Sequence, residues 1–302
     1  MLNSSRRRSL LLAALSLPAL SACSTSRSRE VSAAGLEAAS RQLDALEQGF
    51  TDGRIGVAAL DTGSGARLLH RADERFPFCS SFKIMPVCAL LARSAKEPDL
   101  LSRVIRYRRQ DLVINSPVTE RHVDTGMSVA ALCAAALQYS DNTAANLLIR
   151  LVGGTAAVTA YARSIGDGSF RLDRMEIELN ESVPGDARDT TTPAATAATL
   201  QRVLLGDALD ASSRAQLTDW MLGNRVGTAR IRAGVPAGWR VADRTGTGAY
   251  ATANDIAMLY PPHRAPIALA VYTTRERGAA DNGDYDEARI AAVARVVVAA
   301  FG

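Results

Sequence analysis

The residue pattern changes twice along the 302-residue chain, and this alternation limits the possible folds more than any other feature. Residues 36–50 place apolar side chains three and four apart, which predicts a helix, and residues 54–71 hold two apolar runs around a Gly-Ser-Gly turn, which predicts a hairpin. Residues 78–223 are rich in Ala and Leu at helical spacing, apart from a polar loop at about 174–192. After residue 239 strand-like runs return, and residues 286–302 predict a closing helix.

This order of elements predicts an α+β fold. The economical arrangement is a three-layer α/β domain, whose antiparallel sheet is built from both chain ends and flanked by the terminal helices, with an all-α domain inserted. We expect the α/β domain to comprise residues 33–77 and 224–302, and the all-α domain to comprise residues 78–223. A cleft between the two parts is the expected place for a binding site.

The first 22 residues predict an export signal. Three arginines at positions 6–8 precede a short apolar run and a small-residue exit, and arginines in tandem resemble the twin-arginine signal. The ending LSAC resembles a bacterial lipobox, which implies a lipid on Cys23, with residues 23–32 as a tether. The alternative is an ordinary signal cut near Ala22, with Cys23 incidental. The expected location is the periplasm or cell envelope, anchored to a membrane by lipid.

Charge and histidine content argue against two classes of function. The formal net charge is +4, and removing the three arginines of the signal leaves +1, without a basic run interleaved with aromatics, so we expect no nucleic-acid partner. The three histidines, His70, His122 and His263, stand far apart, and no Cys/His metal spacing occurs. We therefore expect no metal and no cofactor, and we look for a base other than histidine.

Ser80 and Lys83 form the first candidate catalytic pair. Lys83 is one of only two lysines, the other being Lys96, in a chain with 35 Lys and Arg residues. A serine attacks a carbonyl only when a base takes its proton, and a lysine with a lowered pKa can do so whereas arginine cannot. A serine in the first turn of a helix also leaves its main-chain N–H free for an oxyanion.

Three further motifs occur in the same chain: Ser140-Asp141-Asn142 between two helical runs, Glu176 with Asn180 in the polar loop, and the run DRTGTG at 243–248 late on a predicted strand. Taken singly they read as a helix cap, a solvated loop and a glycine-rich strand end. Their order and separations are very unlikely to arise together by chance.

With Ser80 and Lys83, these motifs resemble the motif set of class A serine β-lactamases. The resemblance covers almost the whole chain after about residue 33 and implies the β-lactamase/transpeptidase-like fold. It implies a monomeric hydrolase that opens the amide bond of small β-lactams and thereby causes antibiotic resistance.

The resemblance also implies a role for each catalytic residue. Ser80 would be the nucleophile, and Lys83 would accept or relay its proton. Ser140 would pass a proton to the leaving nitrogen. Glu176, held with Asn180, would activate the water that hydrolyses the acyl-enzyme. An Arg174–Asp189 ion pair would hold the polar loop closed.

The implied substrate contacts come from several segments. Asn142 would bind the side-chain amide, and the N–H groups of Ser80 and Thr247 would form the oxyanion hole. The remaining substrate-binding positions are Asn180, Arg244, Thr245, Gly246 and Thr247, together with Arg230, which matches a position from which some members supply a guanidinium.

The chain departs from the family pattern at several positions. Arg244 stands where lysine is usual, which resembles the carbenicillin-hydrolysing branch and removes a titratable amine. Asn115 and Ile177 stand where tyrosine and proline are common. Cys79 resembles half of the carbapenemase disulfide, but Gly248 occupies the partner position.

A second disulfide position is also altered. Cys133 matches one half of a helix-linking bridge, while Cys88 is one residue away from the usual partner. One residue on a helix is a rotation of about 100°, so we doubt the bridge.

These observations favour an exported serine β-lactamase acting mainly on penicillins, with some cephalosporins. Two alternatives remain: a D-alanyl-D-alanine peptidase of the same superfamily and a non-hydrolytic β-lactam sensor. The Glu176/Asn180 loop argues against the peptidase, because that loop serves deacylation.

Overall fold

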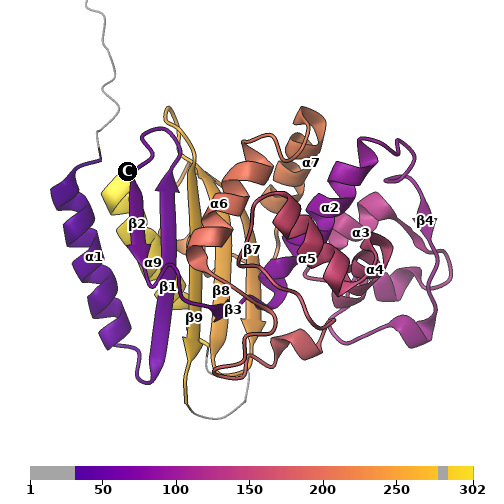
Figure 1. The fold of residues 1–302 in the computed structure, drawn as a ribbon, viewed down its shortest axis with the longest axis horizontal. Helices are drawn as coiled ribbons and strands as arrows, with labels where there is room; N and C mark the ends of the chain where they lie inside the picture. The colour runs from indigo at the N-terminus through magenta and orange to yellow at the C-terminus, as the bar shows by residue number, and fades with distance from the viewer. Residues whose placement is uncertain (1–30, 278–284, 302) are drawn as a thin grey trace, which may run out of the picture.

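A five-stranded antiparallel sheet is the middle layer of the structure, a computed structural model that describes residues 31–277 and 285–301 (Figure 1). Its strand order is β2-β1-β9-β8-β7. The strands are β1 (Gly53–Asp61), β2 (Arg67–His70), β7 (Arg240–Gly248), β8 (Thr252–Tyr260) and β9 (Ile267–Arg275). β1 pairs with β9 in a register that sets Val57 opposite Val271, so the two chain ends share one sheet, as predicted.

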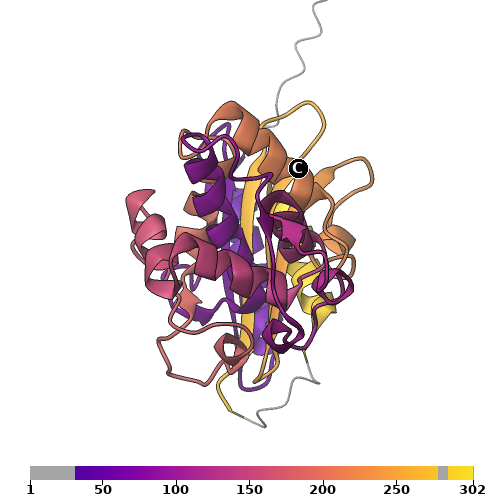
Figure 2. The same cartoon turned by 90° about the vertical axis from the view of Figure 1, so that its right-hand side faces the viewer.

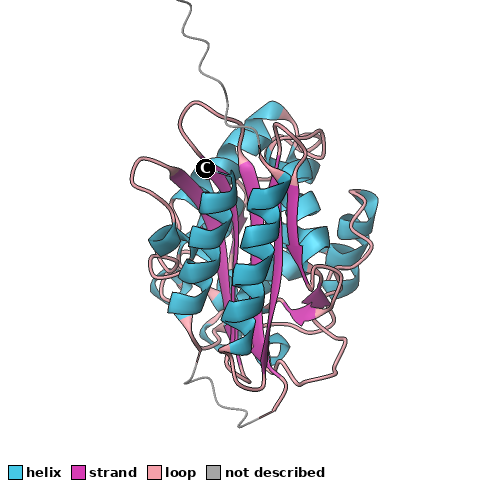
Figure 3. Ribbon diagram, turned by 90° about the vertical axis from the view of Figure 1, so that its left-hand side faces the viewer, coloured by secondary structure: helices cyan, strands magenta, loops and turns pink. Residues whose placement is uncertain are grey.

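Two long helices lie side by side across one face of this sheet (Figure 3). They are α1 (Ala33–Gln48) and α9 (Glu287–Phe301), with the short α8 (Ile231–Gly234) beside α9. The predicted stripe of α1 buries Leu43, and α9 buries Val293 and Val297 against the sheet. Each such side chain, fully buried, contributes about 1.5–3 kcal/mol to stability, so the terminal helices hold the two chain ends together.

The other face carries α6 (Pro193–Leu204), and the remaining helices gather beside the β7 edge of the sheet, where one of them, α7, packs against β7 (Figures 1 and 2). These are α2 (Ile84–Ser94), α3 (Val129–Gln138), α4 (Asn142–Val152), α5 (Thr155–Ser164) and α7 (Ala211–Leu222). Two short antiparallel strand pairs connect loop segments. In the first, β3 (Phe76–Pro77) pairs with β6 (Thr190–Thr191), and in the second, β4 (Val104–Ile105) pairs with β5 (Met127–Ser128). The 3-10 turns are η1 (Cys79–Lys83), η2 (Arg109–Asp111), η3 (Thr119–His122) and η4 (Glu178–Asn180).

The sequence prediction of an α+β fold is confirmed, while the domain boundaries at residues 78 and 223 stay a prediction. The export signal, Cys23 and most of the tether lie outside the described residues. Within the described residues, no single helix is long and apolar enough to cross a membrane. The pair α4 and α5 passes that test only jointly, with a bend of 72° between them.

The segment around the serine differs from expectation in one respect. Ser80 lies on the 3-10 turn η1, not in the first turn of an α-helix, and α2 begins only at Ile84. A 3-10 turn has three residues per turn, so Ser80 and Lys83 still lie on one side. Pro86 falls in the first turn of α2, where N–H groups lack helical partners anyway, so it does not require a kink.

Cys79, Cys88 and Cys133 are buried free thiols. Burial raises the pKa of each, for Cys79 to about 12. The absence of a Cys88–Cys133 bridge agrees with the doubt raised by the one-residue offset.

Candidate functional site

A cleft of about 560 Å³ lies between the edge strand β7 and the helical part. This volume suits a small molecule. The cleft brings together residues from distant motifs: Ser80, Ser140, Asn142, Asn180, Arg230, Thr245, Gly246 and Thr247. Lys83, Glu176 and Arg244 are buried, and their polar groups contact residues of this lining. The structure thus gathers all eleven site residues predicted from the sequence in one place.

The Ser80 hydroxyl donates to a carboxylate. Its Oγ lies 2.9 Å from Glu176 Oε1. Strand β7 packs closely against the turn that carries Ser80. A Cβ added at Gly246 would lie 2.5 Å from the Phe78 carbonyl oxygen and 3.0 Å from the Ser81 nitrogen, which is too close for any side chain. Glycine at this position therefore lets β7 approach the serine turn closely enough to bring Thr247 into the same cleft.

Lys83 is fully buried and surrounded by oxygen atoms. Its Nζ lies 2.8 Å from the Ser140 carbonyl oxygen, 2.6 Å from Asn142 Oδ1 and 3.0 Å from Glu176 Oε1. Desolvation lowers the pKa of Lys83 to about 8, while the charge of Glu176 acts to raise it. The amine is therefore mostly protonated at neutral pH, yet it can lose a proton at small cost.

Glu176 is 2% exposed and both of its oxygens are engaged. Oε1 faces Ser80 and Lys83, and Oε2 accepts from Asn180 Nδ2 at 2.6 Å. The main chain of Glu176 is held on both sides by the amide of Asn146, at 2.9 and 2.8 Å. The Glu176–Ile177 peptide is cis.

Asn146 is a residue that the sequence analysis missed. It follows Asn142 by four residues on α4, so both lie on one face of the helix. That spacing was the available signal, since a helix that presents Asn142 to the cleft also presents Asn146 to the adjacent polar loop. The helix-cap reading of this motif is confirmed for Asp141, whose buried carboxylate caps α4 and also accepts from Val118 and Thr119, which follow the cleft residue Pro117.

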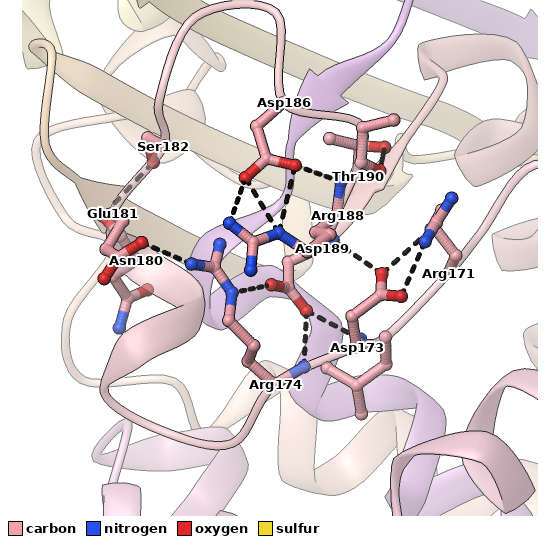
Figure 4. A network of polar contacts seen from close by, with 12 residues as sticks. Arg171, Asp173, Arg174, Asn180, Glu181, Ser182, Asp186, Arg188, Asp189 and Thr190 are labelled. Carbon is pink, nitrogen blue, oxygen red and sulfur yellow. Dashed lines mark hydrogen bonds and ion pairs between the residues drawn. The ribbon is translucent and has the colours of Figure 1, made fainter.

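The polar loop that carries Glu176 is closed by ion pairs (Figure 4). The predicted pair is present, with Arg174 Nε 2.6 Å from Asp189 Oδ2. The other Asp189 oxygen accepts from the main-chain N–H groups of Asp173 and Arg174. Arg174 also pairs with Glu181, next to Asn180. Both ends of the loop are thus fastened to each other, which fixes the carboxylate between them.

Ser140 lies between two cationic side chains. Its Oγ is 3.2 Å from Lys83 Nζ and 2.6 Å from Arg244 Nη2. Both contacts use oxygen lone pairs, so the hydroxyl proton is left to donate into the cleft. Arg244 is fully buried, and burial lowers its pKa to about 10, so it stays charged at neutral pH.

Asn142 uses part of its amide within the protein. Its Oδ1 accepts from Lys83, and its Nδ2 donates to the Ile114 carbonyl at 3.0 Å. A second Nδ2 hydrogen remains beside the cleft that Asn142 lines.

Arg230 directly precedes α8, and its side chain extends to the cleft wall, where the residue is 3% exposed. Its Nη2 donates to Thr247 Oγ1 at 2.7 Å. Its Nη1 donates to the carbonyl oxygens of Gly246 and Asn254, at 2.7 and 2.8 Å. The guanidinium and the Thr247 hydroxyl thus form a cationic corner that can take a carboxylate.

Comparison with known proteins agrees with this arrangement. The family described as "Beta-lactamase enzyme family" matches residues 38–301. The carbapenem-hydrolysing β-lactamase KPC of Klebsiella oxytoca is 55% identical over 258 residues, covering 85% of this chain and 87% of that protein. β-Lactamase Toho-1 of Escherichia coli is 45% identical over 302 residues and covers 100% of both chains.

A solved structure is similar to this chain in both sequence and fold. The class A β-lactamase of the last common ancestor of Gram-negative bacteria is 57% identical, with a TM-score of 0.83, over 88% of this chain and 100% of that one. Sequence family, identity and fold thus agree with the geometry of the cleft. The chain belongs to the β-lactamase enzyme family, and it is a class A serine β-lactamase, a hydrolase of β-lactams that causes antibiotic resistance.

Proposed function

We propose that this enzyme is a monomer that hydrolyses mainly penicillins, and some cephalosporins, through an acyl-enzyme on Ser80 that Glu176 helps to hydrolyse. One observation carries the proposal. A single carboxylate oxygen, Glu176 Oε1, lies within hydrogen-bond reach of both Ser80 Oγ, at 2.9 Å, and Lys83 Nζ, at 3.0 Å. Nucleophile and proton acceptor are therefore already in contact.

In acylation, Ser80 Oγ attacks the lactam carbonyl carbon as its proton passes to the Glu176–Lys83 pair. The main-chain N–H groups of Ser80 and Thr247 stabilise the oxyanion. The lactam C–N bond then breaks, and the nitrogen takes the proton that Ser140 directs into the cleft. Lys83 returns a proton to Ser140 across the 3.2 Å contact.

In deacylation, a water attacks the ester carbon while Glu176 takes its proton. The C–Oγ bond breaks, and Ser80 recovers a proton. Asn180 holds the second Glu176 oxygen, which keeps the carboxylate in place for the water.

Substrate binding divides between two ends of the cleft. Asn142 and Asn180 serve the acyl side chain. Arg230, Thr245 and Thr247 bind the substrate carboxylate. Gly246 lets their strand lie close to Ser80, and the buried positive charge of Arg244 adds to the attraction for the carboxylate. Arg244, a feature that resembles the carbenicillin-hydrolysing branch, supports a preference for penicillins.

The substrate preference is tested by steady-state hydrolysis of benzylpenicillin, carbenicillin, a chromogenic cephalosporin and a carbapenem. The expected result is the highest kcat/KM for the two penicillins. A higher kcat/KM for the cephalosporin or the carbapenem would contradict the penicillin assignment while leaving the serine mechanism intact.

Arg230→Ala is expected to raise KM about tenfold or more for carboxylate-bearing substrates, because one charge-assisted hydrogen bond is worth about 1.5–3 kcal/mol. The kcat should change less, since this contact holds the substrate in the ground state as well. The measurement is steady-state kinetics with benzylpenicillin. Arg225→Ala removes an exposed arginine nearby as a control, and an unchanged KM in Arg230→Ala would refute the assigned role.

We also propose export to the periplasm or cell envelope with a lipid on Cys23, supported by the signal-like first 22 residues. Cys23→Ala is expected to move the protein from the membrane fraction to the soluble fraction. Fractionation and intact-mass analysis of the full-length product measure this. A wild-type protein that is already soluble and starts at another residue would contradict the lipid anchor.

A further inference from the structure

A second cavity, of about 480 Å³, lies between the polar loop and the end of the sheet. Loop residues 182–187 form one part of its wall, and Figure 4 shows Ser182 and Asp186 on this part of the loop. The rest of the wall comes from the start of β1, the chain around β3 and the end of β9. No wall residue is shared with the substrate cleft, so the two hollows are separate.

Arg75 is a cation of this cavity wall whose charge is not compensated locally. Its Nη1 donates to the Ser169 carbonyl oxygen at 2.9 Å and to Thr190 Oγ1 at 3.0 Å, and both acceptors are neutral. Within the residues that the structure describes, its Nε and Nη2 hydrogens meet no acceptor. These two nitrogens form one edge of the guanidinium, and such an edge matches the two oxygens of a carboxylate.

The carboxylates of the same wall do not oppose an incoming anion, because each is already paired with an arginine. Glu74 lies 3.1 Å from Arg54, Asp186 lies 2.7 Å from Arg188, and Glu276 lies 3.4 Å from Arg54. An anion that reaches the open edge of the guanidinium therefore meets a positive charge with little competition.

The loop side of the cavity is apolar. Val183 is 41% exposed, an unusual position for a large apolar side chain, and it lines the cavity together with Pro184 and Ala187. Pro77 adds an apolar surface from the end of β3. A ligand that covers these side chains gains from the burial of apolar area.

We propose that this cavity is a second ligand site, which binds a small carboxylate with an apolar body. The carboxylate lies on the open edge of Arg75, and the body packs against Val183 and Pro184. The site is independent of the substrate contacts assigned to the cleft, and its occupant bridges the polar loop and the sheet.

Benzoate is the probe for this site, because it joins a carboxylate to a flat apolar ring. A bidentate charged contact with ring packing corresponds to a Kd of about 1 mM. Titration of the isotope-labelled protein should shift the amide NMR signals of Val183, Gly185 and Ala187. At about ten times this Kd, Tm should rise by about 3–5 °C. Acetate, without the ring, and benzamide, without the charge, should each bind about tenfold more weakly or worse.

Three variants locate the contact. Arg75→Gln should abolish the benzoate-dependent shifts and the rise in Tm. Arg75→Lys keeps the charge but loses the guanidinium edge, so its Kd should rise about tenfold. Arg67→Gln removes an exposed arginine of β2 outside the cavity and should bind benzoate like the wild type. The Tm of each variant without benzoate shows whether it is folded, and Arg75→Lys carries the test if Arg75→Gln is not.

Two results would overturn the proposal. One is the absence of shifts in residues 182–187 at benzoate concentrations well above the expected Kd. The other is a response that Arg75→Lys and Arg75→Gln retain in full but Arg230→Ala loses, since benzoate would then occupy only the carboxylate corner of the substrate cleft. Equal affinity for acetate and benzoate would likewise refute a ligand with an apolar body.

Discussion

Glu176→Gln is expected to acylate with benzylpenicillin and then to stall as a covalent adduct on Ser80. The substitution keeps the size of the side chain but removes the base for the hydrolytic water. Loss of a general base typically costs about 10²–10⁴ in rate, or about 3–5 kcal/mol on the barrier of deacylation.

Acylation survives in this variant because of Lys83. The negative charge of Glu176 acts to raise the pKa of Lys83, so its removal lowers that pKa further below the present value of about 8. More of the amine is then neutral at pH 7, and it can take the proton of Ser80 itself. The two steps are therefore expected to separate in Glu176→Gln although they are coupled in the wild type.

Intact-mass spectrometry after mixing with benzylpenicillin measures the adduct, and steady-state assays measure turnover. Glu178→Gln is the matched control, since Glu178 lies on the same loop but is exposed. Equal turnover in Glu176→Gln and wild type would show that this carboxylate is not the deacylation base. An adduct that accumulates equally in the wild type would mean that deacylation is slow without any mutation.

The order of helices and strands was predictable from the sequence because it depends on local patterns. The stripe of residues 36–50 became α1, and the two apolar runs around the Gly-Ser-Gly turn became β1 and β2. Pairing of β1 with β9 follows from the return of strand-like segments after a long helical middle, since strands with apolar faces must find partners.

The backbone around Ser80 was not predictable in the same way. Apolar spacing around Ser80 reads as one helix, but the chain forms a 3-10 turn first, with Cys79 at a φ of 45°. This geometry depends on the close approach of Gly246 from a strand more than 160 residues later in the chain. Local propensity contains no information about such a contact, and tertiary packing overrides it.

The polar partners of the site were only partly predictable. The spacing of Ser80 and Lys83 indicated a nucleophile and a base. The contacts of Lys83 with Asn142 and Glu176 join residues that are far apart in the sequence, so local spacing could not predict them. Family resemblance indicated Arg230, whereas its partner Glu287 lies 57 residues away and belongs to no motif. Buried charges require partners, but the sequence does not say which ones.

Lys83→Arg is expected to abolish acylation, measured as loss of the Ser80 adduct within the time in which wild type completes many turnovers. Arginine keeps the positive charge beside Glu176 but cannot give up a proton at accessible pH. The proton of Ser80 must reach Ser140 to allow the lactam nitrogen to leave, and Lys83 Nζ is in contact with both Glu176 and Ser140. Without a group that cycles a proton there, this path is interrupted.

The control separates a chemical effect from a structural one. Lys96→Arg changes the only other lysine, which is exposed, and should leave turnover and Tm unchanged. Because Lys83 is fully buried, Lys83→Arg can also strain its surroundings, so its Tm and its non-covalent binding of a β-lactam are measured alongside. A folded variant that binds but does not acylate supports the proton relay. Near-normal acylation by Lys83→Arg would show that Lys83 acts through its charge alone, and that Glu176 can take the Ser80 proton without it.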